Sequence, residues 1–459
     1  MRVTLLSIIL LTTITLPAQQ RLSLKECIDF ALANNETLAI AAYEGDIATT
    51  QVNEQLAGGL PQITGDVGIT KNIEIQTSFI EDFISPAIYG VLLEENLLTG
   101  VDIPQAQTFP AIFGTNYTGR AGLNVNQLIF NGSYFVGLKA AKTVKLLSEK
   151  KLKQTEVDVI QNVSNAYYLV LISQENLAFL ATNFATIDTL LNETTIMFEN
   201  GFAEKIDVSR VKIQHNNLTT NLRNSTELLV TAISVLKFQM GMPIQEPLAL
   251  TGDLNDFVMD LELVDSKNAF LDRPEYDVQQ TNKELIKLNM KNFQSQYLPS
   301  IYADYNFGWT AGTNTFNELS TLNSETWFRY SSIGVSMSIP IFDGLYKRSR
   351  IQRTKVQFLQ AETGIDQLKN SIEREIEEAQ VKLKNATRDV QAQKENTTLA
   401  QDVYNVTKIK YQEGVGTNQD VIQANSSLKE AQTNYLNAVY DAITSQIELK
   451  KSLGTLNNN

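Results

Sequence analysis

The twelve residues from Lys410 to Val421, KYQEGVGTNQDV, decide how this chain is organised. A helix-compatible run of about seventy residues leads into them, and about thirty-five more helix-compatible residues follow. Gly414 ends the first run, because glycine readily takes the left-handed conformation that closes a helix. Thr417 and Asp420 have the spacing of a capping box, which predicts the start of a second helix. This stretch is therefore predicted to be the tip of a helical hairpin.

A near copy of this tip lies earlier in the chain, from Met197 to Val208, and reads MFENGFAEKIDV. Gly201 stands 213 positions before Gly414, and Asp207 stands 213 positions before Asp420. The same spacing at two functionally distinct positions of the tip is typical of an internal duplication. One hairpin is therefore predicted to occur twice.

Outside the hairpins, the hydrophobic period changes from helical to two, which predicts strands with one apolar and one polar face. Each half of the chain is predicted to contain two such strands. Their expected ranges are about 62–70, 117–130, 300–310 and 328–342. The joins between strands and helices also repeat, as an LP pair before the first strand and as IFNG or IFDG after the second. The residues that mark these joins are Pro61, Phe130, Gly132, Pro299, Phe342 and Gly344.

The order helix, strand, strand, long helix, tip, helix is thus expected to run through the chain twice. The first repeat is assigned to 21–264 and the second to 265–459. Their hairpins are expected at 132–241, with its tip at 198–208, and at 344–454, with its tip at 411–421. We expect a helix over 23–58, another over 266–296, and a long loop with a short helix over 71–115. The fold class is mainly α with a small β part.

The N-terminal twenty residues read as a secretory signal peptide, with one positive charge, an apolar run and then Pro-Ala. The chain is acidic, with a formal net charge of −13 and a pI near 4.8, and it shows no basic stripe, which argues against nucleic acid as a partner. The single cysteine, Cys27, has no partner for an internal disulfide and is interpreted as a helix-packing residue.

The predicted strands have the length and the alternation of strands that cross an outer membrane. Four strands are too few to close a membrane barrel, for which eight is the practical minimum, whereas three chains supply twelve. Aromatic side chains gather near both ends of the strands, as the two girdles of a membrane barrel require. A soluble sheet that packs its apolar faces inward is the alternative left open by the pattern alone.

Taken in order, these features resemble the TolC-type outer-membrane efflux protein family, the outer membrane factors. The resemblance covers essentially the whole mature sequence and rests on LSLKECIDFALANN near the start, the LP, IFNG and IFDG joins, the two tips, and the closing KKSLGTL. It implies a homotrimer with a twelve-stranded outer-membrane barrel, continued by a helical tunnel through the periplasm of a Gram-negative cell. The tunnel would dock a periplasmic adaptor and an inner-membrane pump at the helical tips, Gly201 and Gly414.

The resemblance also implies that the tips close the tunnel and that acidic residues line the constriction. Its gate tyrosine and first gate aspartate match Tyr411 and Asp420, with Asp207 and Phe198 at the first tip. Gln423 stands where the best-known members often carry a second aspartate. The alternative for both aspartates is a purely structural one, since the first turn of a helix favours an acidic side chain.

The sequence predicts no enzyme, no cofactor and no metal site. No nucleophile–base set or phosphate-binding loop is present, and the lone His215 has no nearby Cys or His in the sequence. The expected function is a passive exit duct of a tripartite efflux or type I secretion system. The alternative is a periplasmic coiled-coil structural protein or pump adaptor without a pore of its own.

Overall fold

The computed structural model describes residues 20–103, 105, 107–254, 268–321 and 325–456. The predicted signal peptide therefore lies outside the described residues except for Gln20, and so does the start of the expected 266–296 helix. The chain forms two compact units, which are described in turn. Unit 1 comprises Met1–Thr50, Lys142–Lys287 and Lys355–Asn459, and unit 2 comprises Gln51–Ala141 and Leu288–Thr354.

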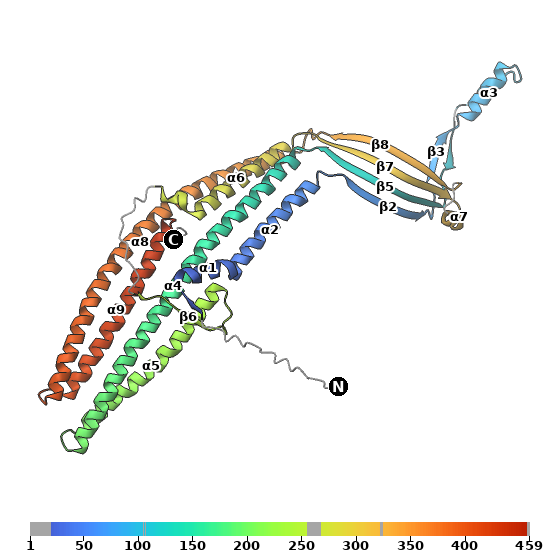
Figure 1. Ribbon diagram of the computed structural model, residues 1–459. Coiled ribbons are helices and arrows are strands. Elements are labelled where there is room, and N and C mark those ends of the chain that lie inside the picture. The colour runs from blue at the N-terminus through green and yellow to red at the C-terminus, as the bar shows by residue number, and fades with distance from the viewer. Residues whose placement is uncertain (1–19, 104, 106, 255–267, 322–324, 457–459) are drawn as a thin grey trace, which may run out of the picture. The chain divides into compact units, whose positions relative to one another are not determined.

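Two helical hairpins make up most of unit 1 (Figure 1). In the first, α4 (Gly132–Glu199) is followed by α5 (Lys205–Met240); in the second, α8 (Tyr346–Gln412) is followed by α9 (Asn418–Ser452). The hairpins pack against each other through a hydrophobic cluster drawn from all four helices. The buried members of this cluster are Leu180, Ile187, Leu190, Val211, Leu218, Tyr404, Val421, Ala424 and Leu428.

One face of α8 carries an apolar stripe, and this stripe is buried against the end of α9 in the second hairpin. Its side chains recur at spacings of three and four residues, which keeps them on one face of a helix. Ile372, Ile376 and Leu383 are almost fully buried and pack against Leu449 and Leu453 near the end of α9. The helical period in the sequence therefore determines which face of α8 is covered by its partner.

The N-terminal segment contains two helices where one was predicted over 23–58. α1 (Leu24–Asn34) begins with a capping box between Ser23 and Glu26, and α2 covers Glu36–Ala57. Asn35 lies between them in an extended conformation, and its side-chain oxygen accepts hydrogen bonds from the N–H groups of Thr37 and Leu38. A single continuous helix was therefore the wrong prediction, because this asparagine caps a new one.

Cys27 lies fully buried in the core that joins α1 to α4 and α5, which confirms its interpretation as a packing residue. Burial, with a smaller contribution from the Glu26 charge, raises the pKa of its thiol to about 12. Next to this core, β1 (Gln20–Leu22) pairs in parallel with β6 (Leu248–Leu250).

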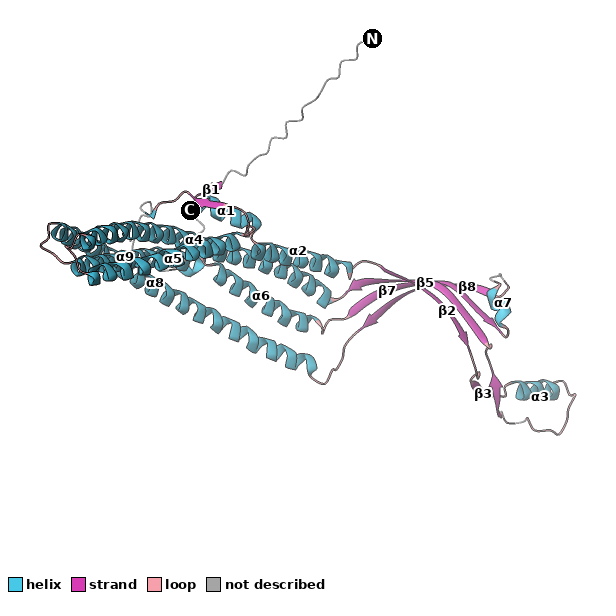
Figure 2. Ribbon diagram, turned by 90° about the horizontal axis from the view of Figure 1, so that it is seen from below, coloured by secondary structure: helices cyan, strands magenta, loops and turns pink. Residues whose placement is uncertain are grey.

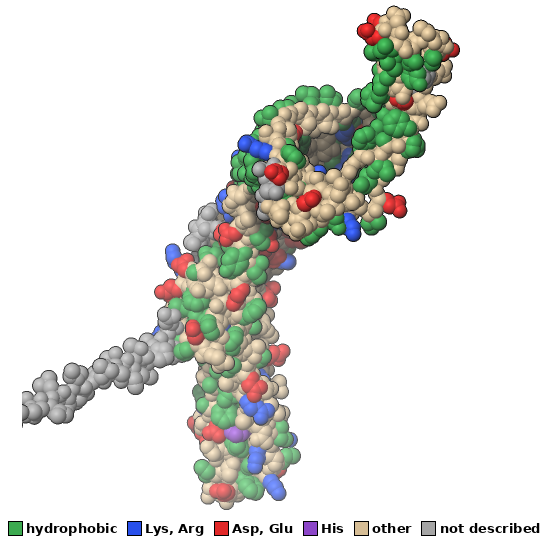
Figure 3. Space-filling model, turned by 90° about the vertical axis from the view of Figure 1, so that its right-hand side faces the viewer, with side chains coloured by type: hydrophobic (Ala, Val, Ile, Leu, Met, Phe, Trp, Pro, Cys, Tyr) green, Lys and Arg blue, Asp and Glu red, His purple; other side chains and the backbone are tan. Residues whose placement is uncertain are grey.

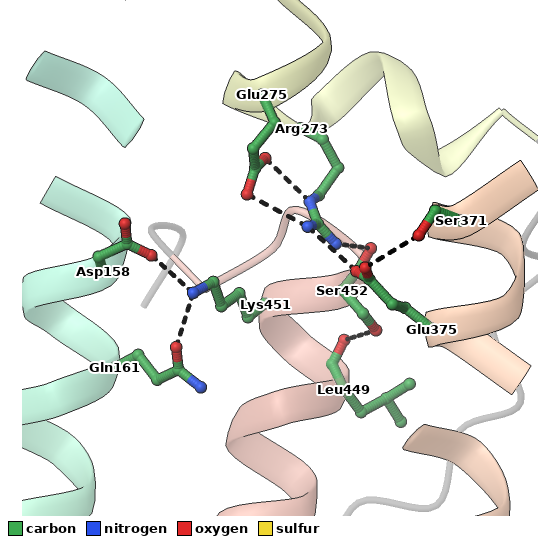
Figure 4. Close-up of polar contacts among 9 residues, drawn as sticks. All are labelled: Asp158, Gln161, Arg273, Glu275, Ser371, Glu375, Leu449, Lys451 and Ser452. Carbon is green, nitrogen blue, oxygen red and sulfur yellow. Dashed lines mark hydrogen bonds and ion pairs between the residues drawn. The ribbon is translucent and has the colours of Figure 1, made fainter. Parts of the chain in front are cut away.

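Ion pairs join four parts of unit 1 around Arg273, as Figure 4 shows. Arg273 follows a 3₁₀ turn, Ala269–Asp272, and precedes α6 (Pro274–Ser295). Its guanidinium donates to Glu275 at 3.0 and 3.2 Å, to Glu375 of α8 at 3.3 Å, and to the carbonyl of Ser452 at 3.2 Å. We call these four residues the arginine clamp. The clamp ties the start of α6 and the end of α9 to α8.

Lys451 extends the arginine clamp to α4 by donating to Asp158 at 2.6 Å and to Gln161 at 2.7 Å (Figure 4). Burial alone would raise the pKa of Glu275. The hydrogen bonds and charge of Arg273, with the more distant charge of Lys451, outweigh that effect and hold the pKa below its usual range. Glu275 is therefore a permanently charged partner of the clamp near neutral pH.

Unit 2 is built on a four-stranded antiparallel sheet of order β2-β5-β7-β8 (Figure 2). β2 covers Gln62–Lys71, β5 Tyr117–Phe130, β7 Ser300–Thr313 and β8 Trp327–Ser338. Pro61 and Pro299 stand directly before β2 and β7, while Phe130 ends β5 and Gly132 begins α4. Within the described residues, β2 and β8 are the edges of this sheet.

The two faces of the sheet differ in chemistry, as the alternation predicts. Register pairs place Asn124, Asn306 and Ser332 in one row on the polar face. Hydrophobic side chains gather on the other face, along the outer side of the curved sheet in Figure 3. Val67 of β2 is 84% exposed and Ile333 of β8 is 82% exposed. We call this the apolar face of the sheet.

Two features of unit 2 differ from the sequence-based expectation. The fourth strand was expected to reach Phe342, but β8 ends at Ser338, because Pro340 has no N–H for a strand ladder. Phe342 therefore lies in the irregular connection before α8, and Gly344 lies in the turn that ends it, with a φ of 65°. The third strand, in contrast, continues three residues past its expected end at 310.

The expected loop over 71–115 contains a strand pair and a helix. β3 (Thr77–Glu81) pairs with β4 (Thr108–Ile112), and α3 (Ile84–Glu94) stands between these two strands in the sequence. A second short helix, α7 (Phe316–Ser320), follows β7. The short helix was anticipated, but the strand pair was not, because these residues show no regular alternation. Among the described helices, none is long and apolar enough to span a membrane.

Candidate functional site: the two hairpin tips

The first hairpin tip is closed by glycine. Gly201 has a φ of 78°, a left-handed conformation that costs other residues energy. Its N–H donates to the carbonyl of Phe198 at 3.0 Å, and the N–H of Phe202 donates to Met197 at 2.7 Å. This pair of bonds is the Schellman arrangement, which satisfies the last carbonyls of α4.

The second tip repeats the same arrangement 213 residues later. Gly414 has a φ of 75°. Its N–H donates to Tyr411 at 3.1 Å, and the N–H of Val415 donates to Lys410 at 3.0 Å. The duplication inferred from residue types is thus also a duplication of individual backbone hydrogen bonds.

Thr417 and Asp420 start α9 with the capping box predicted from their spacing. The Thr417 hydroxyl and backbone N–H donate to the Asp420 carboxylate at 2.7 and 3.2 Å, and the Asp420 N–H donates back to the hydroxyl at 3.2 Å. These bonds from the Thr417 side chain and backbone, with a smaller effect of the Lys410 charge, lower the pKa of Asp420. Its carboxylate is exposed on the single chain.

Asp207 has a related position at the start of α5. Its carboxylate accepts a hydrogen bond from the N–H of Glu204 at 3.2 Å and lies 3.7 Å from the guanidinium of Arg210. Asp207 is half-buried and already paired with a cation, whereas Asp420 has no ion pair among the described residues. The two aspartates are therefore not equivalent, although they occupy matching positions.

Tyr411 links the two hairpins near their tips. Its hydroxyl lies 3.0 Å from the hydroxyl of Thr194 on α4 and 3.7 Å from the sulfur of Met197. Thr194 is fully buried, so this contact lies inside the helix packing. The predicted gate tyrosine is thus held by the neighbouring hairpin, with no contact to Asp420 among its hydrogen bonds.

Asn418 is a second link between the tips, and the sequence reasoning missed it. Its side-chain amide donates to the carbonyl of Asp207 at 3.0 Å, and its side chain is buried. Asn418, Val421, Asn425 and Leu428 follow one another at spacings of three, four and three, so polar side chains stand inside an apolar stripe. That interruption of the apolar stripe is the sequence signal from which a packing role for Asn418 could have been predicted.

Apolar side chains are exposed around both tips. Phe202 is 84% exposed and Val415 is 77% exposed, and Phe198 and Ile206 are also exposed. Gln423 lies on the exposed side of α9. The structure thus brings all the predicted tip residues to the same end of the two packed hairpins, where apolar side chains are exposed.

Other chemistry is sparse. Within the described ranges, no group of three or more His, Cys, Asp and Glu side chains is arranged to hold a metal ion. His215 of α5 lies 3.2 Å from the carboxylate of Asp188 and packs against the ring of Phe184. This histidine is therefore part of the contact between α4 and α5.

Two long hairpins with paired tips, joined in one chain to membrane-length strands, define the class of outer-membrane ducts. The sequence matches the family described as outer membrane efflux protein over residues 27–241 and 275–455. The chain belongs to this family. It is an outer-membrane protein and serves as an exit duct of efflux systems. The family match favours this function over the alternative of a periplasmic adaptor without a pore.

Several named relatives are similar along most of the chain. The outer membrane protein TolC of Vibrio cholerae is 21% identical over 426 residues, which cover 91% of this chain and 95% of the relative. TolC of Escherichia coli is 22% identical over 349 residues, covering 73% and 69%. The probable efflux pump outer membrane protein TtgC of Pseudomonas putida is 20% identical over 436 residues, covering 94% and 83%.

Solved structures show the same fold. The outer-membrane channel OprN has a TM-score of 0.72 at 16% identity, and the match covers 94% of this chain and 90% of that chain. The open state of the Neisseria gonorrhoeae MtrE outer membrane channel has a TM-score of 0.71 at 17% identity, covering 94% and 89%. The expected mixture of long helices and a small sheet is thus an outer-membrane channel fold.

Proposed function

We propose that three copies of this chain close a twelve-stranded barrel through the outer membrane. The observation that carries this proposal is the exposed apolar face of a sheet that has two free edges, β2 and β8. Such a face needs a cover, and lipid provides it for a barrel. Joining the β8 edge of one copy to the β2 edge of the next satisfies both edges and closes the ring after three copies.

The helical hairpins would then extend into the periplasm and form the tunnel, with each repeat supplying one hairpin per chain. The exposed apolar tips at Gly201 and Gly414 are the surface on which a periplasmic adaptor and, through it, an inner-membrane pump would dock. The duct itself carries no catalytic residue in this proposal. Its partners supply the energy and choose the drug, metal or protein that is exported.

The tips would also form the gate, with Asp420 as its main charged residue and Asp207, Tyr411, Phe198 and Gln423 around it. Three Asp420 carboxylates around the threefold axis would attract cations. Their mutual repulsion would raise their pKa values, whereas the Thr417 cap lowers the pKa within each chain. The cap thereby favours the ionised form that a cation-selective ring needs.

Single-channel recording in planar bilayers tests this function. The sharpest variant is Asp420→Asn, since the amide oxygen still accepts the bonds that cap α9 while the charge is removed. We expect small, cation-selective openings from the wild type and a clear loss of cation preference from Asp420→Asn. Asp207→Asn is the matched comparison, with a smaller effect expected because Arg210 already neutralises Asp207.

Each result has a definite reading. Unchanged selectivity in Asp420→Asn, with the helical circular dichroism preserved, would leave the duct in place and reduce Asp420 to a helix cap. Absence of any conductance from correctly assembled protein would overturn the duct. Tyr411→Phe, which removes the hydroxyl that faces Thr194, is expected to lengthen or enlarge the openings if the tips are a gate.

A further inference from the structure

The apolar face of the sheet carries two charged side chains, Lys71 and Arg329, among the residues of its four strands, and both are cations. The register assigns the other charged residues of these strands, Asp66, Arg120 and Asp304, to the polar face. The two cations therefore stand apart from every acidic side chain of the sheet. A face that would contact lipid is thus neutral along most of its length and positive at two positions.

Both cations lie toward the end of the sheet that is remote from the joins to the long helices. Lys71 is the last residue of β2, and Arg329 is the third residue of β8. The Lys71 ammonium lies 5.8 Å from the centroid of the Tyr117 ring, and the Arg329 guanidinium lies 5.0 Å from that of Phe307. Aromatic side chains mark the interface of a membrane barrel, and a cation on the lipid side costs least at that depth.

Within the part of the chain that the structure describes, both cations contact aromatic rings and neither pairs with a carboxylate. Among the ion pairs of the described residues, none includes Lys71 or Arg329. Both side chains are exposed, so their donors are open to an external acceptor. Stacking over an aromatic ring orients each cation and leaves its N–H groups free.

We propose that Lys71 and Arg329 bind phosphate groups of anionic lipid at the membrane interface. The inference rests on the proposed barrel, in which this end of the sheet reaches the leaflet that faces the cell exterior. Lipid phosphates are the anions present at that depth, and basic side chains at a membrane surface attract them. A soluble anion inside the duct would meet Arg120 on the polar face instead. The ligand is therefore the lipid headgroup, and a trimer would carry three copies of each cation.

Native mass spectrometry of the purified trimer tests this directly, with diphosphorylated lipid A added to the micelles and its dephosphorylated form as the comparison lipid. We expect the wild type to retain the phosphorylated lipid preferentially. The double variant Lys71→Gln/Arg329→Gln should weaken that retention by at least about tenfold, since each basic residue near a membrane surface contributes a factor of about five in binding and two together contribute about thirtyfold. Arg120→Gln is the matched control and should retain the lipid.

Equal retention of the two lipids by the wild type, or unchanged retention by the double variant, would overturn the proposal. Conductance of the same double-variant sample tests the barrel independently of lipid binding. A trimer that conducts but retains no lipid has lost the lipid site and kept the duct. If the double variant does not assemble, the charge-preserving variant Lys71→Arg/Arg329→Lys takes its place. That variant, like the wild type, should lose the phosphorylated lipid at high salt, and salt-insensitive retention would contradict the proposed charge pairing.

Discussion

Arg273 shows how single residues hold unit 1 together. Its side chain is almost fully buried and donates to two carboxylates and a backbone carbonyl. A buried cation is tolerated only where such partners compensate for lost hydration. Removing one partner of a buried charge network therefore lowers the free energy of unfolding far more than removing one partner of an exposed ion pair. Comparing two such substitutions tests the role of the arginine clamp.

We predict that Arg273→Ala destabilises the helical unit by about 3–5 kcal/mol, because it leaves the Glu275 carboxylate and the Ser452 carbonyl without their donor. Arg374→Ala is the matched control, since Arg374 pairs with Glu378 on the exposed side of α8 and should change stability by only about 0.5 kcal/mol. Thermal unfolding followed by circular dichroism at the helical band measures both. Equal shifts in the two variants would contradict the role assigned to the clamp.

At the scale of elements, the hairpin tips were predictable because their signals are local. A glycine, a capping residue (Glu204 at the first tip and Thr417 at the second) and an aspartate three residues later specify each turn without help from the rest of the molecule. The contact between Tyr411 and Thr194 was not predictable, because it depends on how two helices far apart in sequence pack. The strand pair of β3 and β4 also escaped prediction, since its residues lack the alternation that identified the other strands.

The left-handed glycines give a prediction for the tips. Gly414→Ala should destabilise the second tip by about 1–2 kcal/mol, because an L-residue is strained at its φ of 75° even though open space surrounds the position. Gly364→Ala, inside α8 with open space around it, should instead stabilise that helix by up to about 1 kcal/mol. Hydrogen exchange of the Val415 N–H, which is bonded to Lys410, reports the tip locally. Slower exchange in Gly414→Ala would refute the strain argument.

At the scale of the whole molecule, a single chain leaves exposed surfaces that need to be covered by lipid or by another protein chain. Its sheet exposes an apolar face and two edges, and its hairpin tips expose apolar side chains. The sequence indicated this incompleteness through a strand count too small for a barrel. The number of copies depends on how the edges meet, which is a property of the assembly. Three copies give twelve strands, an even number that is ordinary for an outer-membrane barrel.

Cross-linking of the two sheet edges in detergent-solubilised protein tests whether three copies of the chain close one barrel. A Val67→Cys/Ile333→Cys double variant places one thiol near the middle of β2 and one near the middle of β8, both on the apolar face. The native Cys27 stays unreactive, because it is fully buried and its pKa is raised to about 12. Each single variant is the control and should yield no covalent oligomer.

With a short flexible bis-maleimide, we expect covalent species of two and three chains and none larger, because the proposed ring closes at three. Products limited to single chains, or a ladder that continues beyond three, would contradict a closed twelve-stranded barrel.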